Sequence, residues 1–458
     1  MEHGPQRIAV LGLGRSGDAV VRWALARPGA TPADVAVFVE HDTPRLEEAA
    51  SAWRAEGVRV ELGVDALPGG RWDLVIASPG ISPSRPLLRS ARLGSAPVIS
   101  ELELAYRLSA APFVAVTGTN GKTTTTALIT HLLRQAGRDA VAVGNIGVPA
   151  VAAAPLVDSG GVVVAECSSF QLTLTLDFHP MVAVLLNITP DHIDWHGSLE
   201  SYAEDKARIF ANMQPGDVAV VDVDDAGAAV WADVVADRGV RVVRVGLSDG
   251  DARVVGGMLT VDAGEGDIAL VRAEDLLIRG VHNVSNALAA SAVALAMGAS
   301  PEAVREGLRT FEPIEHRLEP VGTVRGVEYV NDSKATNPDA VMKALTAFGS
   351  TPLLILLGGR NKGNDFRPLA EACMARCRLA VLYGESRADL EAAFTACGAP
   401  FAGAGTMAEA LSIASDSALP GDVVLLSPAC ASFDEFSDYE DRGRRFAAAV
   451  ARMARETR

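Results

Sequence analysis

Short apolar runs alternate along this sequence with segments of helical periodicity, and this alternation constrains the fold more than any other feature. Runs such as VAVFV and LLILL are rich in β-branched and aliphatic residues, and helix-like segments separate them. This order is typical of parallel strands joined by crossover helices, so the sequence predicts an α/β fold. Strands are expected at residues 8–11, 35–39, 74–77, 113–117, 141–143, 162–166, 182–187, 218–221, 353–357, 379–382 and 423–426.

The pattern restarts twice, near residue 109 and after Phe311-Glu312-Pro313. Because a chain of 458 residues is longer than one hydrophobic core usually supports, we expect three domains. Their predicted bounds are 1–108, 109–313 and 314–458. Helices that would close the first two domains are expected at residues 101–108, 283–297 and 301–310.

The composition argues against several classes of partner. A net charge of −16 disfavours nucleic acids and anionic membranes, which bind electropositive surfaces. The five cysteines lack zinc-site spacing, so we expect them to fill the core of a protein in the reducing cytoplasm. The longest apolar helical stretch, residues 284–297, contains serine and asparagine, which predicts a buried helix and no membrane insertion. With no apolar seam in the sequence, a monomer that handles small molecules is expected.

The first glycine-rich turn, Gly12-Leu13-Gly14-Arg15-Ser16-Gly17, lies between an expected strand and a helical segment. Backbone N–H groups at such a helix start favour phosphate, and the spacing is that of dinucleotide-binding folds. Glu40 lies at the end of the next strand, where NAD-binding enzymes place the carboxylate that binds ribose. Taken alone, the turn predicts a Rossmann-like domain and leaves an NAD-dependent oxidoreductase open.

A second glycine loop, Gly118-Thr119-Asn120-Gly121-Lys122-Thr123, joins an apolar strand to a long helix. Its backbone would cradle phosphates, with Lys122 on the outer phosphates and the Thr123 hydroxyl on magnesium. Val116 stands where the general P-loop pattern has its first glycine, so the loop is a variant. The loop predicts ATP binding by a P-loop ATPase-like parallel sheet, and an oxidoreductase has no use for it.

Polar residues follow two expected strands of the central domain, where an open parallel sheet has its ligand crevice. Glu166 ends the first of these strands. The loop after the second contains Asn187, Asp191, His192, Asp194 and His196. Each residue alone is as well explained by a turn or a cap, but together, downstream of a phosphate loop, they predict magnesium ligands.

Lys206 lies on the apolar stripe of a helix expected at residues 198–213, with Ser198 as its N-cap. A lysine on such a stripe either faces inward or extends from its edge to solvent, and helical spacing alone favours the second arrangement. An inward lysine near magnesium would repel the metal unless its charge were removed.

These motifs resemble those of the Mur ligases, the amide ligases of peptidoglycan synthesis, from Gly12 to about Phe446. GTNGKTT, AECSSFQL and NITPDHIDWH are also similar in kind to folylpolyglutamate synthases, whereas NDSKATNPDA, LLGGRNKGNDF and LSPACASFDEF resemble the D-glutamate-adding member. The resemblance implies that the third domain is a second Rossmann-like domain, which binds the amino acid. It implies ATP-dependent addition of D-glutamate to UDP-N-acetylmuramoyl-L-alanine through an acyl phosphate, with two magnesium ions.

The resemblance also implies roles for individual residues. Lys206 would be carbamylated by carbon dioxide, which turns its cation into a carboxylate able to bind magnesium. The catalytic set would be Lys122, Glu166, His192 and Lys206, and the metal ligands Thr123, Glu166, His192 and Lys206. ATP would be bound by Gly118, Thr119, Asn120, Gly121, Lys122, Thr123, Thr124, Asn283, Asn286, His316, Arg317, Asp332 and Lys334. The UDP substrate would be bound by Leu13, Arg15, Ser16, Ser78, Pro79, Gly80, Gly144, Asn145 and Ser168. D-Glutamate would be bound by Thr336, Lys362, Ser432 and the backbone near Tyr439.

Alternatives remain at this stage. Another Mur-type ligase or a folylpolyglutamate-type ligase would use the same chemistry, although a folate enzyme is not expected to begin with a complete Rossmann-like domain. For Asn283 and Asn286, helix capping or core hydrogen bonding is the alternative to contact with adenine.

Overall fold

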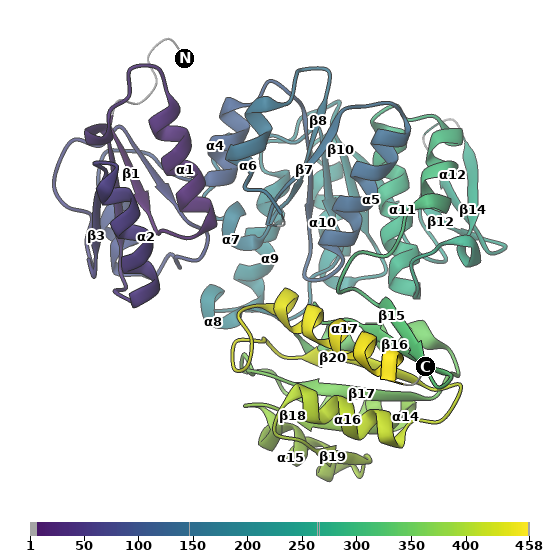
Figure 1. The fold of residues 1–458 in the computed structure, drawn as a ribbon. Coiled ribbons are helices and arrows are strands. Elements are labelled where there is room, and N and C mark those ends of the chain that lie inside the picture. The colour runs from purple at the N-terminus through teal and green to yellow at the C-terminus, as the bar shows by residue number, and fades with distance from the viewer. Residues whose placement is uncertain (1–6, 146, 263, 265, 457–458) are drawn as a thin grey trace. The chain divides into compact units, whose positions relative to one another are not determined.

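The computed structural model describes residues 7–145, 147–262, 264 and 266–456, which form two compact units. The first unit comprises Met1–Glu274 and Ser285–Leu308, and the second comprises Asp275–Val284 and Arg309–Arg458. The first unit contains two of the three sheets and the second unit contains the other (Figure 1). The fold is thus the α/β architecture that the sequence predicts.

The N-terminal sheet of the first unit has the strand order β3-β2-β1-β4-β5, and every pairing is parallel. Its strands are β1 (Ile8–Leu11), β2 (Val35–Val39), β3 (Arg59–Leu62), β4 (Leu74–Ala77) and β5 (Val98–Ser100). Its helices are α1 (Arg15–Ala26), α2 (Pro44–Ala55), α3 (Pro86–Arg92) and α4 (Glu101–Leu108). Gly17 must be glycine, because a Cβ there would lie 2.1 Å from the carbonyl oxygen of Gly12. This contact brings the start of α1 onto the end of β1.

The central sheet of the first unit has the order β14-β13-β12-β11-β10-β9-β6-β8-β7. Its parallel strands are β6 (Phe113–Thr117), β7 (Ala140–Gly144), β8 (Val162–Glu166), β9 (Val182–Leu185), β10 (Val218–Asp222), β11 (Arg241–Val245) and β12 (Ala252–Val255). Two antiparallel strands, β13 (Met258–Asp262) and β14 (Asp267–Arg272), extend the β12 edge. Because β6 lies between β8 and β9, the loops that follow these three strands meet at one edge of the sheet.

The helices around this sheet are α5 (Lys122–Gln135), α6 (Ala150–Ala153), α7 (Ser169–Leu172), α8 (Ile193–His196), α9 (Leu199–Ala207), α10 (Ala226–Ala236), α11 (Val281–Ala296) and α12 (Pro301–Thr310). Helix α9 ends at Ala207 and a 3-10 turn, Arg208–Phe210, continues it, so the helix expected over 198–213 is shorter than predicted. Helix α4 packs against α6, which joins the N-terminal sheet to the central sheet through one continuous core.

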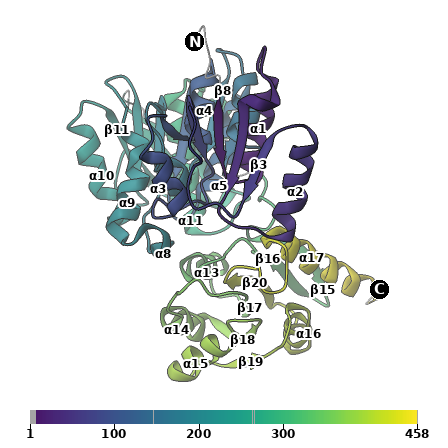
Figure 2. The same cartoon turned by 90° about the vertical axis from the view of Figure 1, so that its left-hand side faces the viewer.

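The second unit contains the six-stranded sheet, with the order β15-β16-β20-β17-β18-β19. Its strands are β15 (Glu319–Val324), β16 (Val327–Asn331), β17 (Leu353–Gly358), β18 (Cys377–Tyr383), β19 (Phe401–Gly403) and β20 (Val423–Ala429). Its helices are α13 (Pro338–Leu345), α14 (Arg367–Arg376), α15 (Arg387–Cys397), α16 (Met407–Ser417) and α17 (Tyr439–Glu456). Figure 2 shows α13, α14 and α15 on one side of this sheet and α16 and α17 on the other, and a separate apolar cluster fills each side.

The cysteines confirm their expected role, since all are free thiols and four of them are buried. Within the described ranges, no helix combines the length and apolarity needed to cross a membrane.

Candidate active site

The phosphate loop is held between β6 and α5 by glycines and by one asparagine. Gly121, the N-cap of α5, has φ +85°, and a Cβ there would lie 2.5 Å from Asn286 Oδ1. Asn187 binds the loop from the end of β9: its Oδ1 accepts from the Asn120 backbone N–H at 2.7 Å, and its Nδ2 donates to the Asn120 carbonyl at 3.1 Å. We predicted Asn187 among magnesium ligands, but both of its polar atoms instead hold the loop.

Lys122 folds back over this loop. Its Nζ donates to the carbonyl oxygens of Gly118 and Thr119, both at 2.8 Å. Thr123 and Thr124 occupy the first turn of α5, where Thr124 is buried and Thr123 half-buried. A helix start with this charge and these hydroxyl groups has the chemistry of a phosphate site.

Glu166, the last residue of β8, has a carboxylate whose surroundings fit a cation ligand. The residue is 1% exposed, and its Oε1 accepts from Asn145 Nδ2 at 2.9 Å. Its Oε2 is buried and has no hydrogen-bond partner. Since an unpaired buried carboxylate oxygen is costly, the atom fits a magnesium ligand. Gly144 lies close to the end of β8, because a Cβ at Gly144 would lie 2.4 Å from the Glu166 carbonyl oxygen.

Lys206 points inward and is 1% exposed, so the solvent-directed arrangement favoured by helical spacing is wrong. Its Nζ donates to the Gly118 carbonyl at 2.7 Å and lies 4.5 Å from the centroid of the Tyr202 ring. Burial lowers the pKa of Lys206 well below its ordinary value, and the charge of Lys122 lowers it further, against the opposing effects of Asp191 and Glu166. The amine is therefore biased toward its neutral, nucleophilic form.

The loop after β9 contains the remaining predicted ligands. His192 is the N-cap of α8 with φ +54°, and its ring lies 4.8 Å from that of Phe170. Both ring nitrogens of His196 are occupied by protein groups, so its prediction as a magnesium ligand is wrong. The side chain of Asp194 lies outside the described structure. Among the described residues, no three His, Cys, Asp or Glu side chains converge as a metal cluster, and the predicted ligand set of Thr123, Glu166, His192 and Lys206 contains only two such residues.

The two strand ends predicted to bind the UDP group lie side by side at the carboxyl edge of the N-terminal sheet. The Ser78 backbone N–H donates to the Leu11 carbonyl at 2.8 Å, and a Cβ at Gly12 would lie 2.9 Å from Ser78 Oγ. Arg15 is exposed in the first turn of α1, while Leu13 is buried. Ser16 is half-buried there, and Pro79 and Gly80 follow Ser78 as a turn.

The Glu40 carboxylate has a structural role. Its Oε1 accepts from the Leu87 backbone N–H at 2.8 Å, and its Oε2 accepts from Arg85 Nε at 2.5 Å. The carboxylate therefore holds the start of α3. Glu40 was the residue that favoured ribose binding in a dehydrogenase, and both of its oxygens instead bind residues at the start of α3.

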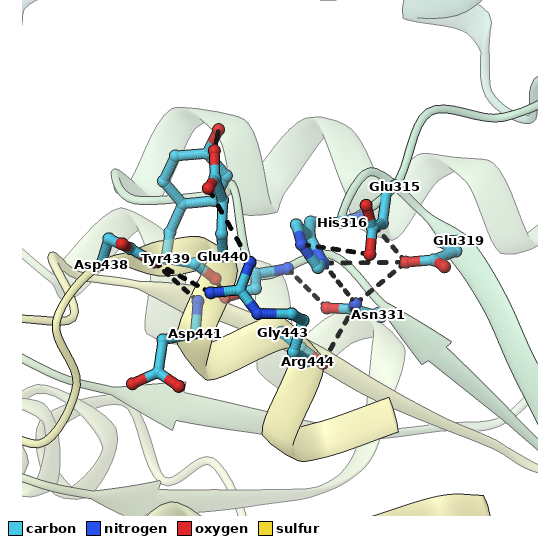
Figure 3. Close-up of polar contacts among 11 residues, drawn as sticks. Glu315, His316, Glu319, Asn331, Asp438, Tyr439, Glu440, Asp441, Gly443 and Arg444 are labelled. Atoms are coloured by element: carbon cyan, nitrogen blue, oxygen red, sulfur yellow. Dashed lines mark hydrogen bonds and ion pairs between the residues drawn. The ribbon is translucent and has the colours of Figure 1, made fainter. Parts of the chain in front are cut away.

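In the second unit, His316 has an unusual backbone and a crowded ring (Figure 3). Its φ is +66°, and its Nδ1 accepts from Asn331 Nδ2 at 2.9 Å. Its backbone N–H donates to Glu319 Oε2 at 2.8 Å. Gly443 of α17 makes room for the ring, because a Cβ there would lie 2.3 Å from His316 Nδ1.

Polar residues predicted to bind nucleotide and amino acid follow neighbouring strands of the six-stranded sheet. Asp332, after β16, accepts from Ser427 Oγ at 2.7 Å, and burial raises the pKa of its carboxyl to about 7. The Lys334 ammonium lies 3.8 Å from the centroid of the Tyr439 ring, and the Tyr439 carbonyl accepts from Ser333 Oγ at 2.8 Å.

The predicted D-glutamate residues share the same sheet edge. Thr336 is half-buried after β16, Lys362 is exposed after β17, and Ser432 is buried after β20. Since β20 pairs with both β16 and β17, the three loops belong to adjacent strand ends. Their role in binding D-glutamate stays a prediction.

Comparison with known proteins identifies the family. Residues 116–294 match the Mur ligase middle domain, and residues 316–430 match the Mur ligase, glutamate ligase domain. A protein of Pelotomaculum thermopropionicum named UDP-N-acetylmuramoylalanine--D-glutamate ligase is 42% identical over 96% of this chain and 96% of its own. This chain belongs to the Mur ligase family.

A Salinibacter ruber protein of the same name is 40% identical to this Mur ligase over 96% of each chain. The UDP-N-acetylmuramate-alanine ligase of Thermotoga maritima has the same fold, with a TM-score of 0.61, 21% identity, and coverage of 97% of this chain and 99% of its own. A bifunctional folylpolyglutamate synthase/dihydrofolate synthase of Yersinia pestis has a TM-score of 0.58 and 19% identity, covering 76% of this chain and 93% of its own. The folate enzyme thus matches a smaller share of this Mur ligase.

The residues predicted to bind ATP in this Mur ligase are divided between its two units. The phosphate loop and Asn286 belong to the first unit, whereas Asn283, His316 and the half-buried Arg317 belong to the second. Asn283 Nδ2 donates to the Arg279 carbonyl at 2.7 Å, which favours the structural alternative for this residue.

Sequence reasoning missed Arg442, which is fully buried on α17 of this Mur ligase. Its guanidinium donates to Ser333 Oγ at 2.9 Å, to the Ser333 carbonyl at 2.8 Å and to the Cys430 carbonyl at 3.1 Å. It therefore joins the loop after β16 to the loop after β20. The signal was present, since Arg442 shares a spacing of four residues with the buried Phe446 and Val450.

Proposed function

We propose that this Mur ligase joins D-glutamate to UDP-N-acetylmuramoyl-L-alanine with conversion of ATP to ADP and phosphate. The observation that carries the proposal is the 42% identity, over 96% of the chain, to a UDP-N-acetylmuramoylalanine--D-glutamate ligase. The third-domain motifs around Thr336, Lys362 and Ser432 support the choice of amino acid. We further propose that the protein acts in the cytoplasm as a monomer on these small-molecule substrates.

In the proposed reaction, the substrate carboxylate attacks the γ-phosphorus of ATP, and the bond from that phosphorus to the β,γ-bridging oxygen breaks to release ADP. The amine of D-glutamate then attacks the acyl carbonyl carbon. The tetrahedral intermediate loses a proton and expels phosphate, which forms the amide. The backbone N–H groups at the start of α5 and the Lys122 ammonium orient the ATP phosphates for the first step.

We propose that Thr123 and Glu166 hold one magnesium ion and that His192 and carbamylated Lys206 hold a second. The unpartnered Glu166 Oε2 supports the first assignment. Bound there, magnesium would neutralise the phosphate and carboxylate charges that crowd together as the acyl phosphate forms.

The environment of Lys206 supports its carbamylation. A neutral amine attacks the carbon of carbon dioxide, forms an N–C bond and releases a proton, whereas an ammonium cannot. Burial and the nearby charge of Lys122 lower the pKa of Lys206 and so favour the reactive form. The product is an anion that takes the place of a buried amine.

The UDP group is proposed to bind at the turn formed by Leu13, Arg15 and Ser16 and at the adjacent Ser78-Pro79-Gly80 turn. Support comes from the helix start at α1, which has no side-chain cap, and from the structural use of Glu40, the carboxylate expected to bind ribose in a dehydrogenase. Gly144, Asn145 and Ser168 are proposed to contact the muramoyl-alanine part of the same substrate.

The decisive test measures phosphate release from ATP with each pair of substrates. We expect release only when UDP-N-acetylmuramoyl-L-alanine and D-glutamate are both present, with L-glutamate and meso-diaminopimelate as matched controls. Equal turnover with either control, or turnover with a dihydrofolate acceptor in place of the UDP substrate, would reject the proposal.

A further inference from the structure

A continuous hydrogen-bonded chain, Ser169–His196–Asp205, runs through the wall of the proposed magnesium site. His196 Nδ1 lies 2.8 Å from Asp205 Oδ2, and His196 Nε2 lies 3.0 Å from Ser169 Oγ. A neutral imidazole with its proton on Nδ1 satisfies both bonds, because Nδ1 donates to the carboxylate and Nε2 accepts from the hydroxyl. Ser169 lies on α7, His196 on α8 and Asp205 on α9.

The hydrogen-bond distances resemble those of a nucleophilic Ser-His-Asp triad. In such a triad, however, the serine oxygen must be accessible to substrate. Ser169 is 3% exposed, and the His196 side chain is 0% exposed. An acyl group has no route to the serine oxygen, so the chain cannot serve as a nucleophile and its general base. Ser169 and the His196 side chain are buried and the Asp205 side chain is 22% exposed, so the chain is largely shielded from water and its hydrogen bonds hold together the elements that it joins.

The ring of His196 is also packed from several sides. It stacks on Phe170 with a centroid distance of 5.4 Å and an interplanar angle of 16°, and it meets the Tyr202 ring edge-on at 5.0 Å. The Tyr202 hydroxyl lies 3.2 Å from Thr119 Oγ1 in the phosphate loop. The histidine thus contacts the residue that links α9 to this loop.

Each element joined by His196 either carries one of the proposed metal ligands or, in the case of α7, begins shortly after the strand that carries one. Ser169 begins α7, three residues after Glu166; His192 is the N-cap of the one-turn helix that ends at His196; and Asp205 precedes Lys206 on α9. Helix α9 packs against both α7 and α8. Breaking the chain would release these elements from one another while leaving every proposed ligand in the sequence.

We infer that His196 is a positioning residue for the magnesium site, which sets the relative positions of Glu166, His192 and Lys206 through its bonds to Ser169 and Asp205. The inference rests on the proposed function, since that function supplies the ligands. It adds a role for residues that bind neither metal nor substrate. Residues that orient metal ligands typically change metal affinity about 10- to 100-fold when they are replaced.

The test is a calorimetric titration of the whole protein with Mg²⁺ in bicarbonate buffer, in the presence of a non-hydrolysable ATP analogue. We expect His196→Ala to raise the Kd for Mg²⁺ about 10- to 100-fold. His196→Asn places an amide near the position of Nδ1 and keeps the bond to Asp205, so a smaller increase is expected. Ser169→Ala removes only one hydroxyl and provides a mild variant should His196→Ala fail to fold.

The chain offers a matched control in a second histidine–aspartate pair. His179 Nε2 lies 2.6 Å from Asp217 Oδ2, but His179 precedes β9, at the strand end opposite the loop that carries His192. His179→Ala should leave the Kd for Mg²⁺ unchanged, whatever it does to the unfolding temperature measured without metal.

The outcomes separate this inference from the proposed function. Weaker Mg²⁺ binding in the order His196→Ala, His196→Asn, wild type supports the positioning role, and in turnover the KM for Mg²⁺ should rise more than kcat falls. An unchanged Kd for Mg²⁺ in the folded His196 and Ser169 variants, even with a lowered unfolding temperature, would overturn it. A wild-type protein that binds Mg²⁺ and nucleotide but does not ligate D-glutamate would sink the proposed function and leave the metal titration as a valid test.

Discussion

Glu101 provides a stability prediction whose size follows from the structure. It is the first residue of α4, is 1% exposed, and lies where α4 packs against α6. Its Oε1 accepts from the Val151 backbone N–H at 2.6 Å, but its Oε2 is buried without a hydrogen-bond partner. Burial raises the pKa of this carboxyl from 4.5 to about 7, against the opposing effect of the backbone donors.

A change in pKa from 4.5 to about 7 disfavours the ionised carboxylate in the folded protein by about 3 kcal/mol. The folded state keeps its proton over this pH range while the unfolded state releases it. The contribution of Glu101 to the free energy of unfolding is therefore fully present below pH 4.5, falls as the pH rises to about 7, and is constant above that. Glu101→Gln removes this titration and should be more stable than the wild type by up to about 3 kcal/mol near pH 8.

The assay is urea unfolding of the wild type and of Glu101→Gln at a series of pH values between 4.5 and 8.5, followed by circular dichroism. The difference between the two proteins isolates Glu101, because other groups that titrate in this range, such as Asp332, are common to both. Glu48→Gln, at an exposed position on α2, is the matched control and should follow the wild type. Parallel stability curves for the wild type and Glu101→Gln would refute the reasoning.

Further predictions concern the site. Lys206→Ala should lose nearly all ligase activity and regain part of it with added short carboxylates, and undiminished turnover would contradict its proposed metal role. Calorimetry should detect binding of a uridine nucleotide at the Gly12–Gly17 turn and no saturable binding of NAD. Gly443→Ala should displace the His316 ring, lower stability by about 1–3 kcal/mol and raise the KM for ATP, which urea unfolding and steady-state kinetics measure. Arg442→Lys cannot make all three guanidinium hydrogen bonds, so a loss of about 2–5 kcal/mol in unfolding free energy is expected, and a stability equal to wild type would deny its structural role.

The central strands of each sheet could be predicted from sequence because parallel strands are buried on both faces. Strands β1, β2, β6 and β8 are apolar runs whose observed bounds equal the predicted ones. Edge strands give a weaker signal: β3 has exposed and half-buried residues, and β14 has exposed residues at both ends and only two buried ones. The hairpin of β12 and β13, which pair antiparallel, was also missed, although Gly256-Gly257 between them is a typical hairpin turn.

Some features of the candidate site can likewise be predicted from neighbouring residues, whereas others depend on contacts between distant parts of the chain. The phosphate loop and Glu166 are visible in sequence because each lies directly at a strand end. The inward direction of Lys206 is not, since its acceptor is the carbonyl of Gly118, 88 residues earlier in the chain. The role of Arg442 likewise depends on Ser333, 109 residues away.

The two lysines at the phosphate loop bear on the carbamylation that we propose for Lys206. Lys122 and Lys206 both donate to the Gly118 carbonyl, at 2.8 and 2.7 Å, so two ammonium groups would share one acceptor in a poorly solvated place. Like charges at that separation repel strongly in a protein interior, and the repulsion is relieved when one amine gives up its proton. Lys206 is the more buried of the two, and Lys122 also donates to Thr119, so Lys206 is the lysine whose pKa is lowered by burial and by its charged neighbour. In the proposed reaction, Lys122 would serve the phosphates, and a neutral amine at Lys206 is the form that carbamylation requires. The same contact that makes an ammonium unfavourable at Lys206 makes an anion favourable there, because a carbamate beside the Lys122 ammonium turns repulsion into attraction.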